Sequence, residues 1–192
     1  MAVQQALTLA HFMTWLGGQE MKHEYDRGRV IPHIVAMAGG VVPHNRIERN
    51  LVRELDTAFE DSPFEAFTSN QLITTIDGEV AYFPDAVLMD GPPMTIRYGT
   101  QQAATNPAVV FEIASPSTRE YDHGRKLEIY KSIATMREIV LVESTMARAV
   151  RHFRVGEGWG AEEVVGLDAR LTVLGVEIPL ARIYRGVELS PG

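Results

Sequence analysis

The sequence predicts an α/β fold with a mixed β-sheet flanked by helices and with additional β-hairpins. Residues 108–144 form a strand, a helix and a second strand, and both strands are apolar on both faces, as is typical of strands inside a sheet. This order gives one crossover unit of a mixed sheet. Residues 43–61 form the clearest helix, because apolar residues recur there at steps of four. These apolar residues are Ile47, Leu51, Leu55 and Phe59.

The other elements follow from caps, turns and alternation. Thr8 can cap a helix that ends at Gly17 and Gly18. Two extended segments are expected about a turn at 26–28, and two more strands about the hairpin signal Asp77-Gly78. Further expected elements are a loop at 91–107, a strand at 108–115, a helix at 121–136, a strand at 138–144, a hairpin of 148–155 with 162–167 about Gly158, Trp159 and Gly160, and a short closing helix at 179–184.

Length and composition limit the class of protein. The chain has 192 residues and no Pro/Gly/Ser-rich linker, so residues 1–192 are expected to form a single domain. No apolar run is long enough to span a membrane and no secretory signal begins the chain, which predicts a cytoplasmic protein. There is no cysteine, which excludes disulfides and thiolate zinc sites. Any metal would therefore be held by oxygen or imidazole.

The formal net charge of −7 argues against binding a polyanion, unless basic residues gather on one face. It does not exclude a nuclease, because a carboxylate-rich active site is negative until a divalent cation fills it.

Glu112 interrupts a strand of otherwise apolar residues. Side chains alternate across a strand, so Glu112 shares a face with Val110 and Ala114. An ionised carboxylate in a core strand is costly unless it is paired, hydrogen-bonded or bound to metal. The alternative is a glutamate at a strand end that reaches solvent or pairs with an arginine.

Asp85 interrupts a second apolar strand, after Pro84, which suggests an edge or a bulge. Lys126 gives the third signal, because a helical wheel of residues 124–136 places it within the apolar arc. A lysine that snorkels from the first turn to solvent is the alternative. The functional interpretation is an ammonium group aimed at two carboxylates.

Two carboxylates and a lysine suit metal-dependent phosphodiester hydrolysis. Oxygen ligands favour Mg²⁺ or Mn²⁺, which acidify bound water, while a lysine can orient the nucleophile and offset developing charge. The sequence has no glycine-rich phosphate loop, G-x-S-x-G elbow or paired-histidine zinc motif.

Several motifs together resemble one protein family. They are "HEYDRGRV", "AMAGGVVPHNRIERNLVREL", "YFPDAVLM", "PAVVFEIASPSTREYDHGRKLEIYKSI" and "REIVLVES". In this order they resemble the Uma-type restriction endonuclease family of the PD-(D/E)XK nuclease superfamily. The resemblance implies a restriction-endonuclease-like core, Mg²⁺ or Mn²⁺ as cofactor, DNA as substrate and a possible homodimer.

The resemblance also implies roles for four residues. Asp85 and Glu112 would bind the metal, and Glu24 would be an auxiliary acid. The usual lysine two positions beyond the glutamate is missing, since Ala114 stands there. The family is similar in having this lysine on the following helix, which matches Lys126.

Other residues near these motifs have simpler interpretations. Ser115 and Ser117 favour turn chemistry over phosphate contact. His44 and Asn45 are expected to be capping or surface residues, and Asp122 the N-cap before Lys126. Gln71 could enter the site from an adjacent strand, although no spacing requires it.

Two other functions remain open. The chain could be a non-catalytic module on the same fold that binds nucleic acid or protein and needs no cation. It could also hydrolyse small phosphoesters. A polymer nuclease should instead group basic residues along a path to Asp85, and the candidates are Arg46, Arg49, Arg53, Arg119 and Arg125.

Overall fold

The computed structural model describes residues 7–32, 41–114 and 122–190. An N-terminal sheet is formed by His23–Asp26 (β1), Arg29–Pro32 (β2), Ile73–Thr74 (β4), Val80–Tyr82 (β5), Thr95–Tyr98 (β7) and Gln101–Ala104 (β8), in the order β2-β1-β5-β4-β8-β7. A central sheet is formed by Phe64–Thr68 (β3), Ala86–Asp90 (β6), Pro107–Ala114 (β9), Glu138–Glu143 (β10), Arg148–Val155 (β11) and Gly158–Val165 (β12), in the order β12-β11-β10-β9-β6-β3. Arg170–Val173 (β13) and Val176–Pro179 (β14) pair separately.

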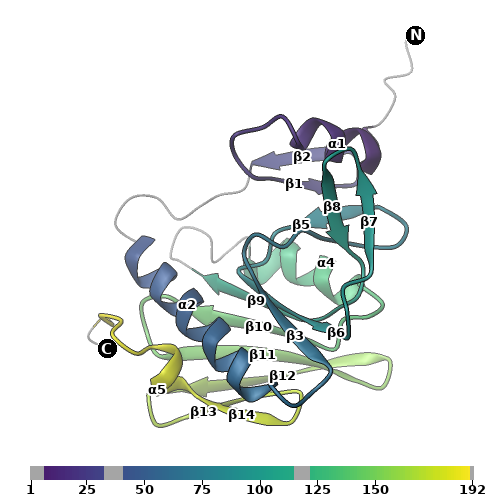
Figure 1. Cartoon of the computed structure of the whole chain (residues 1–192). Helices are drawn as coiled ribbons and strands as arrows, with labels where there is room; N and C mark the ends of the chain where they lie inside the picture. The colour runs from purple at the N-terminus through teal and green to yellow at the C-terminus, as the bar shows by residue number, and fades with distance from the viewer. Residues whose placement is uncertain (1–6, 33–40, 115–121, 191–192) are drawn as a thin grey trace.

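The helices cover these sheets (Figure 1). They are Leu9–Leu16 (α1), Val41–Ala58 (α2), Leu127–Ser132 (α4) and Leu180–Ile183 (α5), and a π-helical turn at Asp122–Lys126 (η1) leads into α4. In the described ranges, every helix is too short or too polar to span a membrane.

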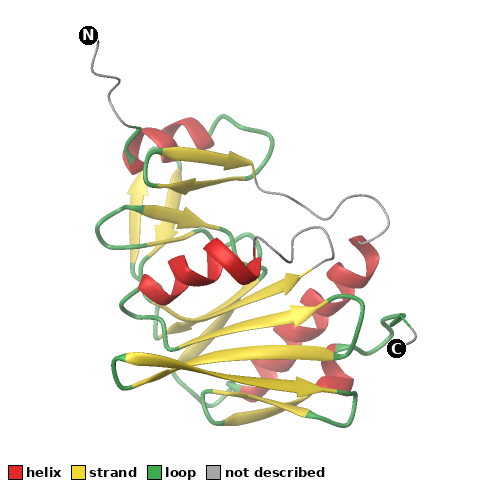
Figure 2. Cartoon of the chain, turned by 180° about the vertical axis from the view of Figure 1, so that it is seen from behind, coloured by secondary structure: helices red, strands yellow, loops and turns green. Residues whose placement is uncertain are grey.

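The central sheet is packed on both faces (Figure 2). Val109, Phe111 and Ile113 of β9 join a core with the apolar face of α2. Val110, between them, joins a second core with α4, so β9 alternates as predicted. Strands β9 and β10 run parallel and are joined through η1 and α4, which confirms the predicted crossover unit.

The chain passes from the N-terminal sheet to the central sheet at residues 83–85, between β5 and β6. Pro84 lies at this transition, outside any strand, and the strand that follows it is an interior one. The expectation of an edge strand is therefore wrong. The bulge in β6 lies instead between Leu88 and Met89. Asp85 is the last residue before β6, so it stands where the two sheets meet.

Three sequence-based assignments are wrong. Residues 91–107 are not one loop, since β7 and β8 form a hairpin about Gly99, which has φ 62°. Their mostly polar, exposed residues hide the strand pattern. Residues 64–89 hold four strands, because β3 pairs with β6 while β4 pairs with β5. The β11–β12 turn lies at 156–157, where Gly156 has φ 59°, and residues 158–160 belong to β12.

We expect Leu51→Ala to lower the free energy of unfolding by about 2–5 kcal/mol, because this fully buried side chain joins α2 to the central sheet. The matched control is Leu167→Ala, at a leucine that is 46% exposed, which should cost about 0.5 kcal/mol or less. Urea denaturation of both variants measures the difference. Equal losses of unfolding free energy in the two variants would mean that packing of α2 on the central sheet does not stabilise the fold.

Candidate active site

Strand pairing brings Asp85 and Glu112 to neighbouring positions. Ala86 of β6 pairs with Phe111 of β9, so the residues one step beyond this pair are Asp85 and Glu112. Asp85 Oδ2 accepts a 2.6 Å hydrogen bond from the backbone N–H of Ile113, which ties the two segments together. Both acids are buried, with 8% of Asp85 and 4% of Glu112 exposed. The alternative of a solvent-reaching glutamate is therefore wrong for Glu112.

Lys126 lies between two acids. Its Nζ is 2.8 Å from Glu112 Oε1 and 3.3 Å from Glu24 Oε1. Glu24 is on β1 of the N-terminal sheet, and Glu112 is on β9 of the central sheet. All three side chains are at most 5% exposed. The structure thus brings together Glu24, Glu112 and Lys126, and strand register adds Asp85.

The position of Lys126 follows from the local helix. It is the last residue of η1 and the N-cap residue of α4, and its side chain forms no cap. Asp122 is the first residue of η1, and its side chain is outside the described part of the structure, so a capping role for it stays a prediction. The ammonium group lies 5.8 Å from the ring centroid of Tyr82 and 6.0 Å from that of Tyr130. Because Lys126 is only 3% exposed, the snorkelling alternative is also wrong.

Tyr130 is part of the same cluster. Its hydroxyl donates a hydrogen bond to Glu112 Oε1, the oxygen that also contacts Lys126. The sequence analysis did not identify Tyr130 as a site residue. A signal was available, because Tyr130 follows Lys126 by four residues and side chains four apart lie on one face of a helix.

His44 contacts the site, contrary to the expectation of a capping or surface role. Its Nε2 lies 3.2 Å from Asp85 Oδ1. Burial lowers the pKa of His44, but the hydrogen bond and charge of Asp85 and the charge of Glu48 outweigh it and raise the pKa. Burial also disfavours the charged form of Asp85 and so raises its pKa. The contacts with His44, the Ile113 N–H and Lys126 outweigh this effect and bring the pKa below its ordinary value. The pair therefore favours a charged carboxylate.

A second group of charges surrounds Asp85 on the α2 side. Glu48 lies one turn after His44, and its Oε1 accepts a 3.4 Å hydrogen bond from the Ser69 N–H. Lys22 Nζ donates a 2.7 Å hydrogen bond to the Ser69 carbonyl. Burial lowers the pKa of Lys22, and the charges of Glu48 and Asp85 oppose that shift. Neither Lys22 nor Glu48 is evident as a site residue from the sequence, because neither interrupts an apolar pattern.

Two further candidates lie within the described residues. Gln71 donates its side-chain hydrogen bond to the carbonyl of its neighbour Leu72, and the exposed Asn45 shares a side-chain hydrogen bond with His44. Ser115, Ser117 and Arg119 fall outside the described residues.

The arginines on α2 are exposed, and each has a hydrogen-bond partner within the protein. Arg46 bonds the Gly186 carbonyl, and Arg49 and Arg53 bond the side chains that follow them on α2. Arg125 is the described candidate that contacts β1, the strand of Glu24, through a hydrogen bond to Asp26.

The donor set fits a hard divalent cation. Asp85 and Glu112 offer carboxylate oxygens at neighbouring positions, and Mg²⁺ is commonly held by one or two carboxylates while it keeps several waters. Among the described residues, no group of three or more histidine, aspartate or glutamate side chains is arranged to hold a metal ion.

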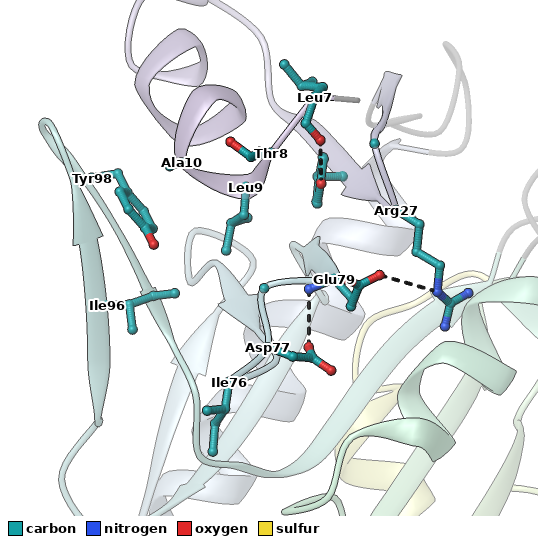
Figure 3. A pocket seen from close by; sticks show the side chains of 13 residues that line it. Leu7, Thr8, Leu9, Ala10, Arg27, Ile76, Asp77, Glu79, Ile96 and Tyr98 are labelled. Atoms are coloured by element: carbon teal, nitrogen blue, oxygen red, sulfur yellow. Dashed lines mark hydrogen bonds and ion pairs between the residues drawn. The ribbon is translucent and has the colours of Figure 1, made fainter. Parts of the chain in front are cut away.

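A separate pocket lies on the N-terminal sheet (Figure 3). It has a volume of about 510 Å³ and is lined by the start of α1, the β1–β2 and β4–β5 turns and β7. Leu9, Ile96 and Tyr98 give it apolar lining, and the ion pair of Arg27 Nε with Glu79 Oε2, 3.9 Å apart, lies beside them. Neither the acids nor the lysine described above line this pocket, so it is distinct from the candidate site.

Comparison with known proteins identifies the family. Residues 9–181 match the family model Uma2, described as "Putative restriction endonuclease". The chain belongs to the Uma2 family. This confirms the resemblance found in the sequence motifs, and the match covers every candidate residue named above.

Relatives and a solved structure extend the comparison. The chain is 28% identical to the uncharacterized protein sll1609 of Synechocystis over 88% of this chain and 94% of that protein. It is also 28% identical to slr1290 of Synechocystis over 94% of this chain and 93% of that protein. A crystal structure from Anabaena variabilis, described as a putative nuclease belonging to DUF820, aligns with a TM-score of 0.69 at 17% identity, covering 92% of this chain and 97% of that one. The α/β fold predicted from this Uma2-family sequence is therefore confirmed.

We expect Lys126→Met to lower the free energy of unfolding by about 3–5 kcal/mol, because it leaves Glu24 and Glu112 buried without their shared cation. Lys131→Met is the matched control on the same helix. Lys131 pairs with the 71% exposed Glu128, so its loss should cost about 0.5 kcal/mol or less. Urea denaturation compares the two, and a similar cost for both would show that the buried cluster does not stabilise the fold.

We expect the stabilising effect of His44 to depend on pH. Its pKa is raised above 6.5, so its contribution is complete below pH 6.5 and is lost as the pH rises through the folded-state pKa. The pKa of Asp85 is lowered below 3.8, so its contribution is present above pH 3.8 and is lost as the pH falls further.

The unfolding free energies of the wild type and His44→Gln should therefore differ most between pH 3.8 and 6.5. Glutamine keeps a donor but does not titrate. Urea denaturation in EDTA across this range and above it measures the difference, which would stay constant with pH if His44 were uncharged.

Proposed function

We propose that this Uma2-family protein is a nuclease that hydrolyses phosphodiester bonds in DNA with Mg²⁺ or Mn²⁺, and that residues 1–192 act as one catalytic domain. One observation carries the proposal. Asp85 and Glu112 occupy neighbouring positions at the ends of two buried strands, with Lys126 Nζ 2.8 Å from Glu112 Oε1. The descriptions of the family and of the Anabaena protein, both of which are those of nucleases, support it.

Asp85 and Glu112 would hold the cation through carboxylate oxygens. When bound, a divalent cation acidifies a water molecule and stabilises charge on the scissile phosphate. The Ile113 N–H and His44 each hold one oxygen of Asp85, so the orientation of its carboxylate is set before substrate arrives. Preorganised groups of this kind need little rearrangement during the reaction.

Lys126 would orient the attacking water and offset the negative charge that develops on the phosphate. Its ammonium group has three donors, and the contacts with Glu24 and Glu112 direct it into the acidic cluster. Glu24 would be an auxiliary acid that acts mainly by holding Lys126, since the 3.3 Å ion pair is its observed contact in the site.

Small-phosphoester hydrolysis is the second candidate, and one observation favours it. Arg53 is paired with Glu54, which reduces the positive charge available to a polyanion, while Arg46 and Arg49 each use part of their donor capacity on neutral oxygens of the protein. The family favours a polymer substrate. Homodimer formation and a cytoplasmic location stay predictions from the sequence.

We expect Asp85→Asn and Glu112→Gln each to weaken Mg²⁺ or Mn²⁺ binding and to lower the rate of DNA cleavage by at least about 100-fold, the order found when one electrostatic group is removed from an active site. Isothermal titration calorimetry and cleavage of plasmid and single-stranded DNA measure the two effects. The matched control is Glu138→Gln. Glu138 is a buried glutamate of β10 that pairs with Arg151 of β11. This variant should keep both properties.

The outcomes separate the candidates. Metal binding with no cleavage of nucleic acid, but with turnover of bis(p-nitrophenyl) phosphate, would favour the small-phosphoester hydrolase. A wild type that binds neither cation at millimolar concentration would contradict the nuclease proposal and favour a binding module.

A further inference from the structure

A second acid–base pair joins the two elements that Glu24 and Lys126 already join. Asp26 on β1 is fully buried, and its Oδ2 accepts a 2.6 Å hydrogen bond from Arg125 Nε and another from the Arg125 guanidinium Nη2. Arg125 is half-exposed and immediately precedes Lys126. The pair therefore lies at the edge of the candidate site.

The two acids on β1, Glu24 and Asp26, lie close together in sequence, as do the two cations on η1, Arg125 and Lys126. Glu24 and Asp26 are two apart on β1, and strand residues two apart share a face. Arg125 and Lys126 end η1. Two neighbouring carboxylates of one strand thus contact two consecutive cations of one helical turn.

Asp26 depends strongly on Arg125. Its Oδ1 accepts no hydrogen bond from any residue in the described ranges. Arg27 Nη1 lies 3.8 Å from this oxygen, on a side chain that is 57% exposed. A buried carboxylate must be paired to remain charged. The two hydrogen bonds that Arg125 donates to Oδ2 are therefore the main compensation for this charge.

The turn that carries Lys126 has little support of its own. Helix α4 has six residues and no side-chain N-cap bond, and η1 has five residues. Isolated helices of this length are unstable in water, so contacts outside the helix must fix where Lys126 points.

We propose that the Arg125–Asp26 ion pair is a positioning device that holds η1 against β1 and thereby keeps Lys126 between Glu24 and Glu112. Arg125 and Asp26 are positioning residues that act through Lys126. Their effect on catalysis rests on the proposed nuclease function, whereas their effect on Lys126 does not.

The lysine content allows a direct test. The chain has three lysines, Lys22, Lys126 and Lys131. Reductive methylation of the full-length protein in EDTA, followed by peptide mass spectrometry, gives a labelling rate for each. The quantity of interest is the rate at buried Lys126 divided by the rate at Lys131, which lies on the same helix.

We expect Arg125→Met to raise this ratio by about tenfold or more, because local opening exposes a buried group without global unfolding. Arg137→Met is the matched control, since Arg137 is 51% exposed and also pairs with an aspartate, Asp90. Asp90 is the last residue of β6, whereas Asp85 of the site precedes the first residue of that strand. It should change the ratio by less than about twofold. Arg125→Lys, which keeps the charge but loses the fork, should give an intermediate ratio at Lys126.

An unchanged ratio in Arg125→Met would overturn the proposal. Equal rises at all three lysines in both Arg125 variants would also overturn it, because the pair would then stabilise the whole fold rather than position Lys126. If the wild type cleaves DNA, Arg125→Met should lower kcat with KM little changed. Because a loss of folded protein alone would also lower the apparent kcat at constant KM, kcat is expressed per folded molecule, with the folded fraction taken from urea denaturation. If the wild type cleaves nothing, the proposed function fails and the labelling ratio still decides this inference.

Discussion

The arrangement of this protein depends on one buried ammonium group. Lys126 is 3% exposed and lies between Glu24 and Glu112, which come from different sheets. Removing such a charge from water is favourable only with close opposite charges and well-placed hydrogen bonds. Close contacts with both acids require that η1 lie where the N-terminal sheet meets the central sheet. This requirement also fixes the positions of Glu24, Glu112 and Lys126 relative to one another.

The two acids of the candidate metal site are supported from opposite sides of the central sheet. Glu112 is held by Lys126 and Tyr130 at the start of α4, whereas Asp85 is held by His44 at the start of α2. Both helices are anchored through apolar faces in separate cores. Each carboxylate is thus oriented by a different core, and their relation to each other is set by the sheet register and by the hydrogen bond from the Ile113 N–H to Asp85.

The sequence predicts some parts of this site better than others, for physical reasons. Glu112 and Lys126 stand out because charged side chains interrupt apolar patterns. His44 does not, because it begins a run of polar residues near the helix start, where a surface histidine is ordinary. The sequence also does not show that the strands divide into two sheets. Alternation of apolar residues shows which face of a strand a residue takes, but not which strand lies beside it. The β7–β8 hairpin escapes notice because its exposed positions are polar.

The separation of Glu24 from Lys126 along the chain has a consequence for synthesis. The site needs residues from β1 and from η1, about one hundred positions apart, together with Glu112 between them in sequence. Contacts between distant segments form late, because closing a long loop costs entropy before the contacts repay it. A polypeptide still emerging from the ribosome, or one truncated before η1, would lack the paired lysine. Any hydrolytic activity of this cluster would accordingly be confined to chains whose translation has passed that turn.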